Sequence, residues 1–349
     1  MNKEVKIKAH TISEDSPVYF IAEMSGNHNM DYDRAVAIID AAKEAGADAV
    51  KLQTYTPDTI TIDCDSELFQ VGKGLWEGRT LYGLYQEAYT PWDWQPKLME
   101  HARDIGIDCF SSPFDLTSVD FLQELNVPAY KIASYEINDI PLIRKVAATG
   151  KPVIISTGIA HLEDIELALR TCREEKNENV ILLKCVSSYP TPYELFNLKG
   201  IPLLREAFDC QVGLSDHSMG SEVAVAAVAL GARVVEKHFT LSRAEGGVDS
   251  AFSMEPAEFS RMVTEIRNVE AALGKPTLEL TEKQEKERGG SRSLFVVSDM
   301  KAGEVFTPDN VRSIRPGAGM HTKYYEQILG RKARRDLKKG TPLDWKYIE

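Results

Sequence analysis

Two histidines close two consecutive apolar runs, and their types and spacing suggest metal chemistry. The run VGLSDHS (212–218) contains His217, and the run VVEKHFT (234–240) contains His238. If these runs are neighbouring parallel strands, the two imidazoles occupy matching positions and converge on one point. Two imidazoles with carboxylates nearby suit a borderline divalent ion such as manganese, cobalt or zinc. The alternative is that each histidine is only hydrogen-bonded at the rim of a sheet.

The elements that must position these histidines alternate between β-rich runs and segments of helical periodicity. The predicted strands are 18–24, 48–55, 108–114, 129–134, 152–158, 180–187, 211–217 and 233–239. Near-continuous apolar strands, each followed by a helical pattern such as 31–47, indicate a parallel sheet that is buried on both sides. Eight such units predict a (β/α)8 TIM barrel. An open doubly wound sheet is disfavoured, because no glycine-rich phosphate turn follows the first strand.

The chain changes character after the eighth unit. Residues 278–293 are charged and then glycine-rich, which is typical of a linker. The segment 294–349 has short β runs and an internal echo, DMKAGE (299–304) against DLKKGT (336–341), which indicates a small pseudo-symmetric β domain. The sequence thus predicts a barrel domain over 1–277, a linker over 278–293 and a β-rich domain over 294–349.

Composition argues against several classes of protein. The chain has 349 residues, is 43% hydrophobic and carries a net charge of −12. It has no basic stripe, so we expect no nucleic-acid partner and no anionic membrane partner. No apolar run approaches the roughly 20 residues that span a bilayer, and the N-terminus lacks the apolar stretch of a signal peptide, so a cytoplasmic protein is expected. Five scattered cysteines without a CxxC pair are typical of reduced thiols.

Polar side chains stand at the downstream end of every predicted strand, which is where a barrel places its active site. Alternate residues of a strand share a face, so Lys51 and Gln53 point the same way, as do Ser215 and His217, and Glu236 and His238. The residues between them, Leu52, Asp216 and Lys237, are expected to point the opposite way. Polar groups inside a barrel are costly to desolvate unless they bind something. We therefore expect a ligand site among these strand-end residues: Glu23, Lys51, Gln53, Ser111, Ser112, Lys131, Ser134, Ser156, Thr157, Ser187, Tyr189, Ser215, His217, Glu236 and His238.

Two lysines inside apolar strands point to an anionic substrate. Lys51 lies in AVKLQ and Lys131 in AYKIAS, where a lysine is rarely solvated. Each is half of an ion pair with a carboxylate, a ligand for phosphate or carboxylate groups, or a Schiff-base lysine. The neighbouring serine hydroxyls suit donation to phosphate or carboxylate oxygens. The carboxylates that are candidates for acid–base work or for binding sugar hydroxyls are Glu23, Glu136, Glu236 and Asp249, the last in a glycine-rich loop (244–253).

Seven motifs in order resemble the sialic acid synthases, which condense phosphoenolpyruvate with an N-acylated hexose: AEMSGNHN, VKLQTY, PAYKIAS, ISTG, YPTPYE, GLSDHS and EKHFT. The resemblance spans the chain, since IRPGAGM (314–320) and DLKKGTPL look like the family's C-terminal antifreeze-like (SAF) domain. Within the family, residues 74–94 and 241–256 look most like the pseudaminic acid synthases, whose acceptor is 2,4-diacetamido-2,4,6-trideoxy-L-altrose. The aromatic residues of 74–94 either contact the methyl group of this sugar or pack against the barrel.

The resemblance implies roles for individual residues. His217 and His238 would bind a divalent metal, manganese in the first place, with magnesium or cobalt as alternatives. Phosphoenolpyruvate binding falls on Lys51, Ser112, Lys131, Ser134, Ser156 and Ser215, sugar binding on Gln53, Tyr189 and Asp249, and Glu23 and Glu236 match acidic positions of the site. Arg315 would reach over from a partner's antifreeze-like domain, so a head-to-head, domain-swapped homodimer is expected. Neuraminate synthases have asparagine in place of Ser187, a departure that puts N-acetylmannosamine in doubt as the acceptor.

The implied reaction gives pseudaminic acid and phosphate. C3 of phosphoenolpyruvate attacks the metal-polarised aldehyde of the open-chain sugar, water captures C2, and phosphate leaves by C–O cleavage. Glu23 is the expected proton-transfer group, with Lys51, Lys131 and Glu236 completing the catalytic set. The alternatives are an N-acetylneuraminate or legionaminic acid synthase and, more remotely, an aldolase that uses pyruvate. A non-catalytic protein whose tail binds carbohydrate or ice is the alternative from another class.

Overall fold

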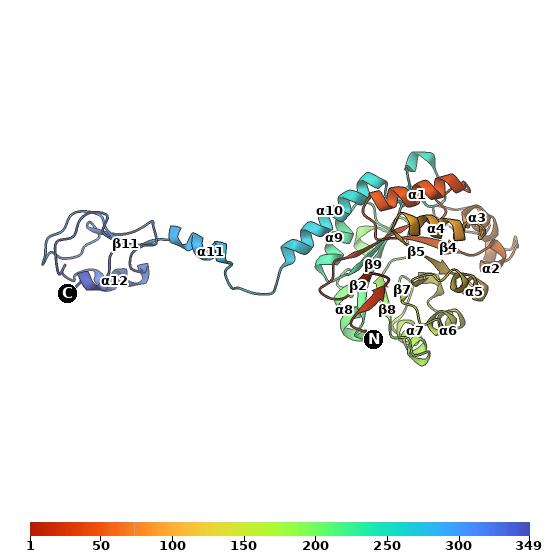
Figure 1. Ribbon diagram of the computed structural model, residues 1–349, viewed down its shortest axis with the longest axis horizontal. Coiled ribbons are helices and arrows are strands. Elements are labelled where there is room, and N and C mark those ends of the chain that lie inside the picture. The colour runs from red at the N-terminus through yellow and green to blue at the C-terminus, as the bar shows by residue number, and fades with distance from the viewer. Residues whose placement is uncertain (73) are drawn as a thin grey trace. The chain divides into compact units, whose positions relative to one another are not determined.

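The computed structural model describes residues 1–72 and 74–349 and divides them into two compact units, Met1–Gly274 and Lys275–Glu349 (Figure 1). In the first unit eight parallel strands close into a barrel in the order β10-β3-β4-β5-β6-β7-β8-β9. The predicted (β/α)8 barrel is confirmed, and the open doubly wound sheet is excluded. The strands are β3 (Tyr19–Glu23), β4 (Ala49–Thr54), β5 (Asp108–Pro113), β6 (Tyr130–Ile132), β7 (Val153–Ser156), β8 (Val180–Lys184), β9 (Gln211–Asp216) and β10 (Val234–His238).

Helices surround the barrel (Figure 1), and α1 (Tyr32–Glu44) illustrates why they form. Asp31 caps its N-terminus by accepting a hydrogen bond from the backbone N–H of Arg34. Gly46 ends it with a φ of +92°, a conformation that favours glycine. The other helices of this unit are α2 (Pro57–Ile60), α3 (Leu81–Ala88), α4 (Gln95–Asp104), α5 (Leu116–Glu124), α6 (Ile140–Ala148), α7 (Leu162–Glu174), α8 (Gly200–Phe208), α9 (Glu222–Ala229) and α10 (Pro256–Leu273).

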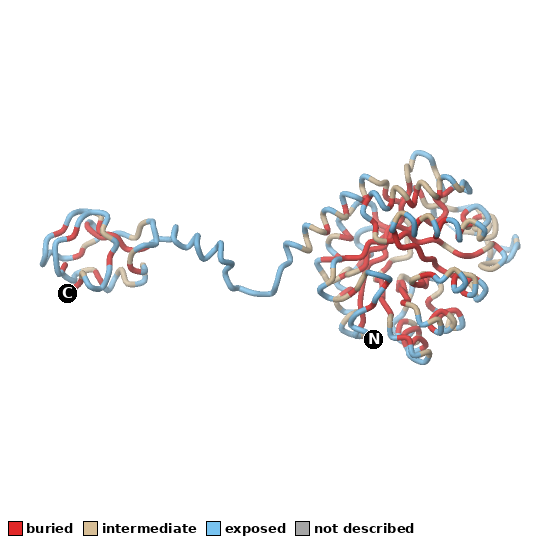
Figure 2. The backbone as a smooth tube through the Cα atoms, in the orientation of Figure 1, coloured by how far each residue is buried: buried red, intermediate tan, exposed pale blue. Residues whose placement is uncertain are grey.

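The core of the first unit lies between the strands and the helices. Figure 2 shows buried backbone along the strands and exposed backbone on the outer turns of the helices. All five residues of β3 and all six of β9 are buried. This pattern is the one expected for parallel strands with helices on one face and a packed barrel interior on the other.

A short antiparallel hairpin, β1 (Val5–Ile7) with β2 (His10–Ile12), was not predicted from the sequence. It lies at the N-terminal ends of the barrel strands, where His10 is 4.0 Å from Asp48 and 3.9 Å from Asp108. Its buried residues belong to the core of the barrel unit. The hairpin therefore belongs to the face of the barrel that is opposite the strands' C-terminal ends.

The second unit has its own small core, built on β11 (Ser293–Val296) and β12 (Val311–Ile314). It also contains α12 (Tyr325–Ile328), and α11 (Glu282–Glu287) falls inside the segment that was predicted as a linker. The domain boundaries predicted at 277 and 293 stay predictions.

The two copies of the echo in the second unit pair with each other. Met300 and Leu337 exchange backbone hydrogen bonds of 2.8 and 2.9 Å. Two reciprocal ion pairs join the copies, Asp299 with Lys338 at 2.8 Å and Lys301 with Asp336 at 2.7 Å. The repeat in the sequence thus corresponds to a pseudo-symmetric contact in the structure.

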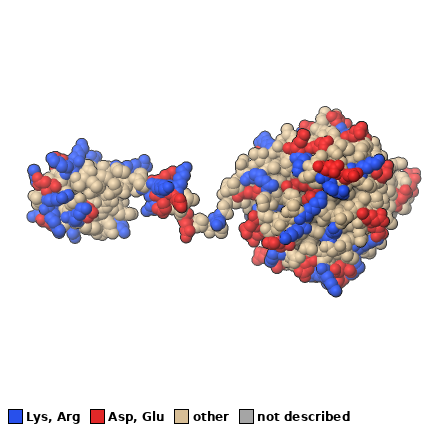
Figure 3. Space-filling model, in the orientation of Figure 1, with Lys and Arg blue, Asp and Glu red and all other residues tan. Residues whose placement is uncertain are grey.

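Acidic and basic side chains are interspersed on the faces of both units that are in view in Figure 3. Within residues 1–72 and 74–349, no helix combines the length and the apolarity that crossing a membrane requires.

Candidate active site

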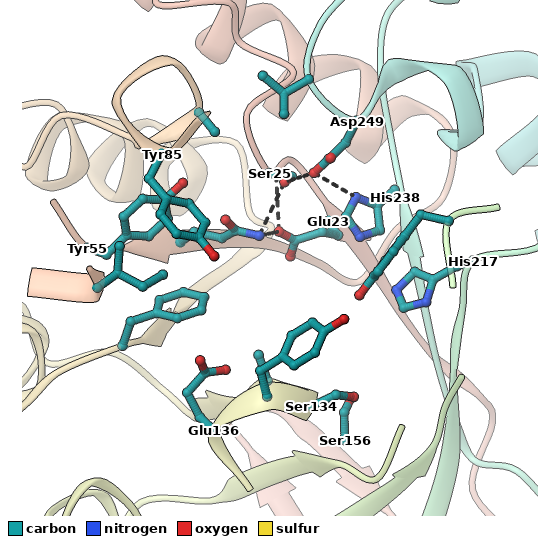
Figure 4. Close-up of a pocket in the computed structure, with 18 of the residues that line it drawn as sticks. Glu23, Ser25, Tyr55, Tyr85, Ser134, Glu136, Ser156, His217, His238 and Asp249 are labelled. Atoms are coloured by element: carbon teal, nitrogen blue, oxygen red, sulfur yellow. Dashed lines mark hydrogen bonds and ion pairs between the residues drawn. The ribbon is translucent and has the colours of Figure 1, made fainter. Parts of the chain in front are cut away.

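A cavity of about 490 Å³ opens at the C-terminal ends of the barrel strands (Figure 4). It brings together most of the residues predicted for the site, although they come from strands all around the barrel and from the loops that follow them. Those that line it are Glu23, Lys51, Gln53, Lys131, Ser134, Glu136, Ser156, Tyr189, Ser215, His217, Glu236, His238 and Asp249. The strand alternation used for the prediction holds, because Leu52, Asp216 and Lys237 are not among the lining residues.

Five residues predicted for the ligand site are not among those that line this cavity: Ser111, Ser112, Thr157, Ser187 and Arg315. The hydroxyl of Ser111 instead pairs with that of Thr54 at 2.6 Å, and the hydroxyl of Thr157 donates to the carbonyl oxygen of Leu183 at 3.1 Å. Ser112 is buried on β5, where it is the register partner of Gln53 on β4, a residue that lines the cavity. Ser187 lies beside the cavity wall, where a Cβ on Gly158 would stand 2.5 Å from its hydroxyl oxygen and 2.6 Å from that of Ser134, so a larger residue at position 158 would displace these hydroxyl groups. Arg315 belongs to the second unit and follows β12.

Two lysines and two carboxylates form a buried charge cluster at the base of the cavity. Lys51 Nζ lies 3.0 Å from Glu23 Oε2 and 3.0 Å from Glu236 Oε1. Lys131 Nζ lies 3.6 Å from the same oxygen of Glu236. Both lysines therefore face a carboxylate, as the ion-pair alternative predicted, and both also face the cavity, where an anion can reach them.

Burial and mutual attraction separate the pKa values of the two carboxyl groups. Burial raises the pKa of Glu23 to about 7, because it outweighs the attraction of Lys51. Burial also acts on Glu236, but the ammonium groups of Lys131 and Lys51 overcome it and lower the pKa of Glu236 to about 2. Two neighbouring carboxyl groups whose pKa values differ this much suit different roles, one exchanging protons and one staying charged.

The pKa values of the two lysines are also shifted in opposite directions. Burial would lower the pKa of Lys51, but Glu23 and Glu236 raise it above its ordinary value. For Lys131 burial prevails and its pKa is lowered. Lys51 thus remains a fixed cation, which weakens the Schiff-base alternative for that residue, since a neutral amine is the nucleophile.

The two histidines meet at the mouth, and their ring centroids are 5.3 Å apart (Figure 4). His217 Nδ1 is 3.0 Å from the carbonyl oxygen of Val186, so in the neutral ring that nitrogen is the donor and Nε2 keeps its lone pair. Burial would lower the pKa of His217, but the neighbouring Cys185 raises it above its ordinary value. His238 Nδ1 is buried without a hydrogen-bond partner and lies 3.7 Å from Asp249 Oδ2. Burial lowers the pKa of His238 well below its ordinary value, so its ring is neutral, the form that binds metals.

These observations fit a divalent ion held by two imidazoles. A lone pair on His217 and an unpaired buried nitrogen on His238 form a suitable pair of donors, and the carboxylate of Asp249 lies 3.7 Å from that nitrogen of His238. In the part of the chain that the structure describes, no group of three or more His, Cys, Asp and Glu side chains could hold a metal ion. A metal at this site would therefore depend on substrate or water for its remaining ligands.

Several unsatisfied buried polar atoms lie in this cavity or beside its wall. Of the side-chain atoms described, those without a partner include Ser112 Oγ, Glu136 Oε2, Ser156 Oγ, Ser187 Oγ, Glu236 Oε2 and His238 Nδ1. Buried polar atoms are normally paired, and each exception calls for a cause. A polar ligand that binds here would supply the missing partners.

Sequence reasoning missed several lining residues. Ser25 donates a hydrogen bond to Asp249 and accepts one of 3.2 Å from Gln53, so it links two other sides of the mouth (Figure 4). Its backbone N–H also donates to Glu23 at 3.1 Å. Cys185 follows β8 and faces His217, with 4.0 Å between its sulfur and Nδ1. Alternation along the predicted strand 180–187 places Cys185 on the same face as Ser187, and that signal could have revealed it.

One side of the cavity is apolar, and the sequence did not predict this side as a whole. Its lining residues come from the segment after β4 and from α2 and α3, with one more after β5: Tyr55, Ile60, Val71, Leu81, Leu84, Tyr85, Ala88 and Phe114. Of the aromatic residues predicted in 74–94, Trp76 and Tyr85 line the cavity. Trp92 instead stacks on Phe121, at 4.7 Å between ring centroids, as the packing alternative predicted.

The closed barrel and the charged cavity at the C-terminal ends of its strands together define a (β/α)8-barrel enzyme that binds a small anionic substrate at that face. The chain belongs to the NeuB family, whose family model matches residues 38–277, and the SAF domain model matches residues 291–349. The expected membership of the sialic acid synthases and the expected antifreeze-like tail are thereby confirmed.

Individual relatives agree with this assignment. The chain is 49% identical to the pseudaminic acid synthase of Campylobacter jejuni serotype O:2, over 94% of this chain and 96% of that protein. It is 44% identical to the pseudaminic acid synthase of Helicobacter pylori, over 95% of this chain and 98% of that protein. The crystal structure of the N-acetylneuraminic acid synthetase of Leptospira borgpetersenii superposes with a TM-score of 0.74 at 34% identity and covers 82% of this chain and 95% of that one.

Proposed function

We propose that this chain condenses phosphoenolpyruvate with 2,4-diacetamido-2,4,6-trideoxy-L-altrose and releases pseudaminic acid and phosphate. The observation that carries the proposal is that the chain is 49% and 44% identical to two pseudaminic acid synthases over 94% and 95% of its length. The cavity supports the proposal independently, since a charged side and an apolar side meet there. A cytoplasmic location stays a prediction.

The charged side of the cavity is suited to phosphoenolpyruvate. Lys51 and Lys131 would neutralise its phosphate and carboxylate groups, because both ammonium groups are already desolvated and fixed by Glu236. The unpaired hydroxyl of Ser156 and the hydroxyls of Ser134 and Ser215 would donate to its oxygens. A reactant held by several fixed donors loses little further entropy on reaching the transition state.

A divalent ion held by His217 and His238, manganese in the first place, would polarise the carbonyl oxygen of the sugar aldehyde. Gln53, Tyr189 and Asp249 would orient the sugar, and Ser25 holds Gln53 and Asp249 in place. Glu23 would exchange a proton during the addition of water at C2, since its pKa of about 7 allows both protonation states near neutral pH.

The apolar side of the cavity favours a deoxy sugar with more than one acyl group. The altrose derivative carries a C6 methyl group and two acetamido methyl groups, which the side chains of Val71, Leu84 and Tyr85 can bury. N-acetylmannosamine carries a hydroxyl group at C6 and one acetamido group, so it would leave a polar group against these side chains. The legionaminic acid precursor differs in stereochemistry and is the closer competitor.

An acceptor panel tests this proposal. With phosphate release as the readout, we expect kcat/KM for the altrose derivative to exceed that for N-acetylmannosamine by about 100-fold, from several methyl contacts. Val71→Asn should reduce this preference by about 10-fold, whereas Leu203→Asn, an exposed change on α8, should leave it unaltered. A higher kcat/KM with N-acetylmannosamine, or turnover with pyruvate, would contradict the proposal.

We also propose that a second copy of the chain covers the mouth. Large apolar side chains are exposed on the loops and first helical turns that follow β5 to β9, which is the face on which the cavity opens: Leu116, Tyr135, Ile159, Leu162, Tyr193, Leu195 and Met219. Apolar groups gathered around an active site in this way indicate a surface that is covered. In the proposed homodimer Arg315 of one copy would complete the site of the other.

Mixing two inactive variants tests the swapped arrangement. Arg315→Ala and His217→Ala should each lose at least about 90% of activity, because each removes a group from the site. After mixing and refolding, one site of each heterodimer regains both groups, so activity should rise to about a quarter of that of the unaltered enzyme. Absence of recovery, in a mixture that light scattering shows to be dimeric, would refute the swap.

A further inference from the structure

A fully buried ion pair lies behind the two histidines, on the face of β9 and β10 that points away from the cavity. Lys237 Nζ is 2.7 Å from Asp216 Oδ2, and the two side chains are 1% and 0% exposed. The two residues are register partners on the adjacent strands. Neither lines the cavity, and neither has a part in the reaction proposed above.

The contacts of this pair bracket His217. Lys237 Nζ also donates to the carbonyl oxygen of Ser218 at 2.8 Å. Asp216 Oδ1 accepts hydrogen bonds from the backbone N–H and the hydroxyl of Ser218, at 2.8 and 2.7 Å. The residues before and after His217 are therefore both tied to one ammonium group, and that group belongs to the residue that precedes His238.

Stability alone gives a weak reason for such a pair. Desolvating two charges costs about as much as their attraction returns, and apolar replacements of similar volume are often neutral or stabilising. The geometry gives a better reason, because β9 ends at Asp216 and His217 stands on the loop that follows. The carbonyl oxygen of Val186 holds the His217 ring, and the Thr191 N–H binds the His217 carbonyl oxygen at 2.9 Å, on the side of β8. The contacts to Asp216 and Ser218 are the ones that tie the backbone on either side of His217 to β10, which ends at His238.

We propose that Lys237, together with Asp216, is a positioning residue that holds the two imidazoles at the separation a divalent cation requires. The proposal rests on the metal site of the proposed function. It differs from the role of Lys51 and Lys131, which face the substrate, since Lys237 acts through the Asp216 carboxylate and the Ser218 carbonyl oxygen, on either side of His217. Groups behind metal ligands commonly change metal affinity by about 10- to 100-fold.

The test measures binding of Mn²⁺ alone to the full chain by titration calorimetry, and the visible absorption of the Co²⁺-loaded protein. Lys237→Met removes the ammonium group and leaves Asp216 uncompensated, so the double variant Asp216→Asn/Lys237→Met is made as well. The double variant carries no buried charge at this place, and the amide oxygen introduced at position 216 can still accept from Ser218. We expect the dissociation constant for Mn²⁺ to rise at least about 10-fold in both variants and the Co²⁺ spectrum to change.

Val235→Ala is the matched control, because Val235 lies on the same face of the same strand and its truncation lowers stability without touching the ion pair. We expect it to lower the melting temperature and leave the Mn²⁺ dissociation constant within about twofold of that of the unaltered chain. An unchanged constant in the double variant, or an equal rise in Val235→Ala, would overturn the positioning role. If the unaltered chain binds no Mn²⁺, the metal site of the proposed function fails instead.

Discussion

Replacing Lys51 with methionine is expected to lower kcat/KM for phosphate release by at least about 100-fold, the loss typical of removing one preorganised charged donor. The ammonium group is held between Glu23 and Glu236 at 3.0 Å from each, so no other side chain can take its place without moving. Its loss also leaves the two buried carboxyl groups facing each other without the cation between them. The substitution therefore removes a substrate contact and leaves one ammonium group, that of Lys131, against two carboxyl groups.

The same variant should change how stability depends on pH. Loss of Lys51 removes an attraction that lowers the pKa of Glu23, so that pKa rises further above about 7. A carboxyl group whose pKa is higher in the folded state than in the unfolded state binds its proton more tightly when the protein is folded. Its contribution to stability is therefore present at low pH and is lost as the pH rises from the pKa of the unfolded state to the pKa of the folded state. We expect the melting temperature of Lys51→Met to fall more steeply than that of the unaltered chain between about pH 5 and pH 8.

Lys184→Met provides the control for both measurements. Lys184 ends β8, does not line the cavity, and donates to the carbonyl oxygen of Cys185 at 3.1 Å. This variant should retain kcat/KM within about twofold, as changes away from a site usually do. If Lys51→Met kept more than about a tenth of the original kcat/KM, the assignment of Lys51 to the anionic reactant would be wrong.

Chelation of divalent metal is expected to abolish phosphate release, and added manganese to restore it. Polarisation of the aldehyde is worth several kcal/mol of transition-state stabilisation, and His217 and His238 are the donors available for the ion at this mouth. The assay follows phosphate from phosphoenolpyruvate and the acceptor after exhaustive dialysis against EDTA. Release should fall at least about 1000-fold and return on addition of Mn²⁺.

Histidine variants separate loss of the metal from a general effect of chelator. His238→Ala should not recover with manganese at concentrations that restore the unaltered enzyme. His101→Ala should recover fully, because His101 lies on α4 and pairs with Asp40 at 2.6 Å, away from the cavity. Phosphate release that continues undiminished after complete chelation would exclude a metal-assisted reaction.

The polar half of this site was predictable because of strand geometry. Once 48–55 is assigned as a strand, alternation sends Lys51 and Gln53 to the interior and Leu52 to the helices, and the cavity lining agrees. The same rule placed Lys237 on the outer face. Strand alternation could not identify Asp216 as the partner of Lys237. Their contact depends on the register between β9 and β10, which neither strand defines alone.

The apolar half was not predictable in this way. Leu81 and Leu84 reach the cavity from α3, which no alternation rule connects to the strand ends. Ser25 reaches Asp249 because its backbone adopts a φ of +48°, a left-handed conformation that a serine rarely shows and that sequence patterns do not signal. Strand alternation thus predicts none of the residues that loops and outer helices place in the cavity, and Glu136 and Asp249 were predicted only as candidate carboxylates.

The four groups Glu23, Lys51, Lys131 and Glu236 are electrically balanced before any ligand arrives, with as many ammonium groups as carboxyl groups. A multiply charged anion entering this enclosed space must bring compensation with it, either as a cation or as protons taken from solvent. Glu23 is the member of the four best able to accept such a proton. Binding of the anion and uptake of the proton are then linked, and the apparent affinity for the anion increases as the pH falls.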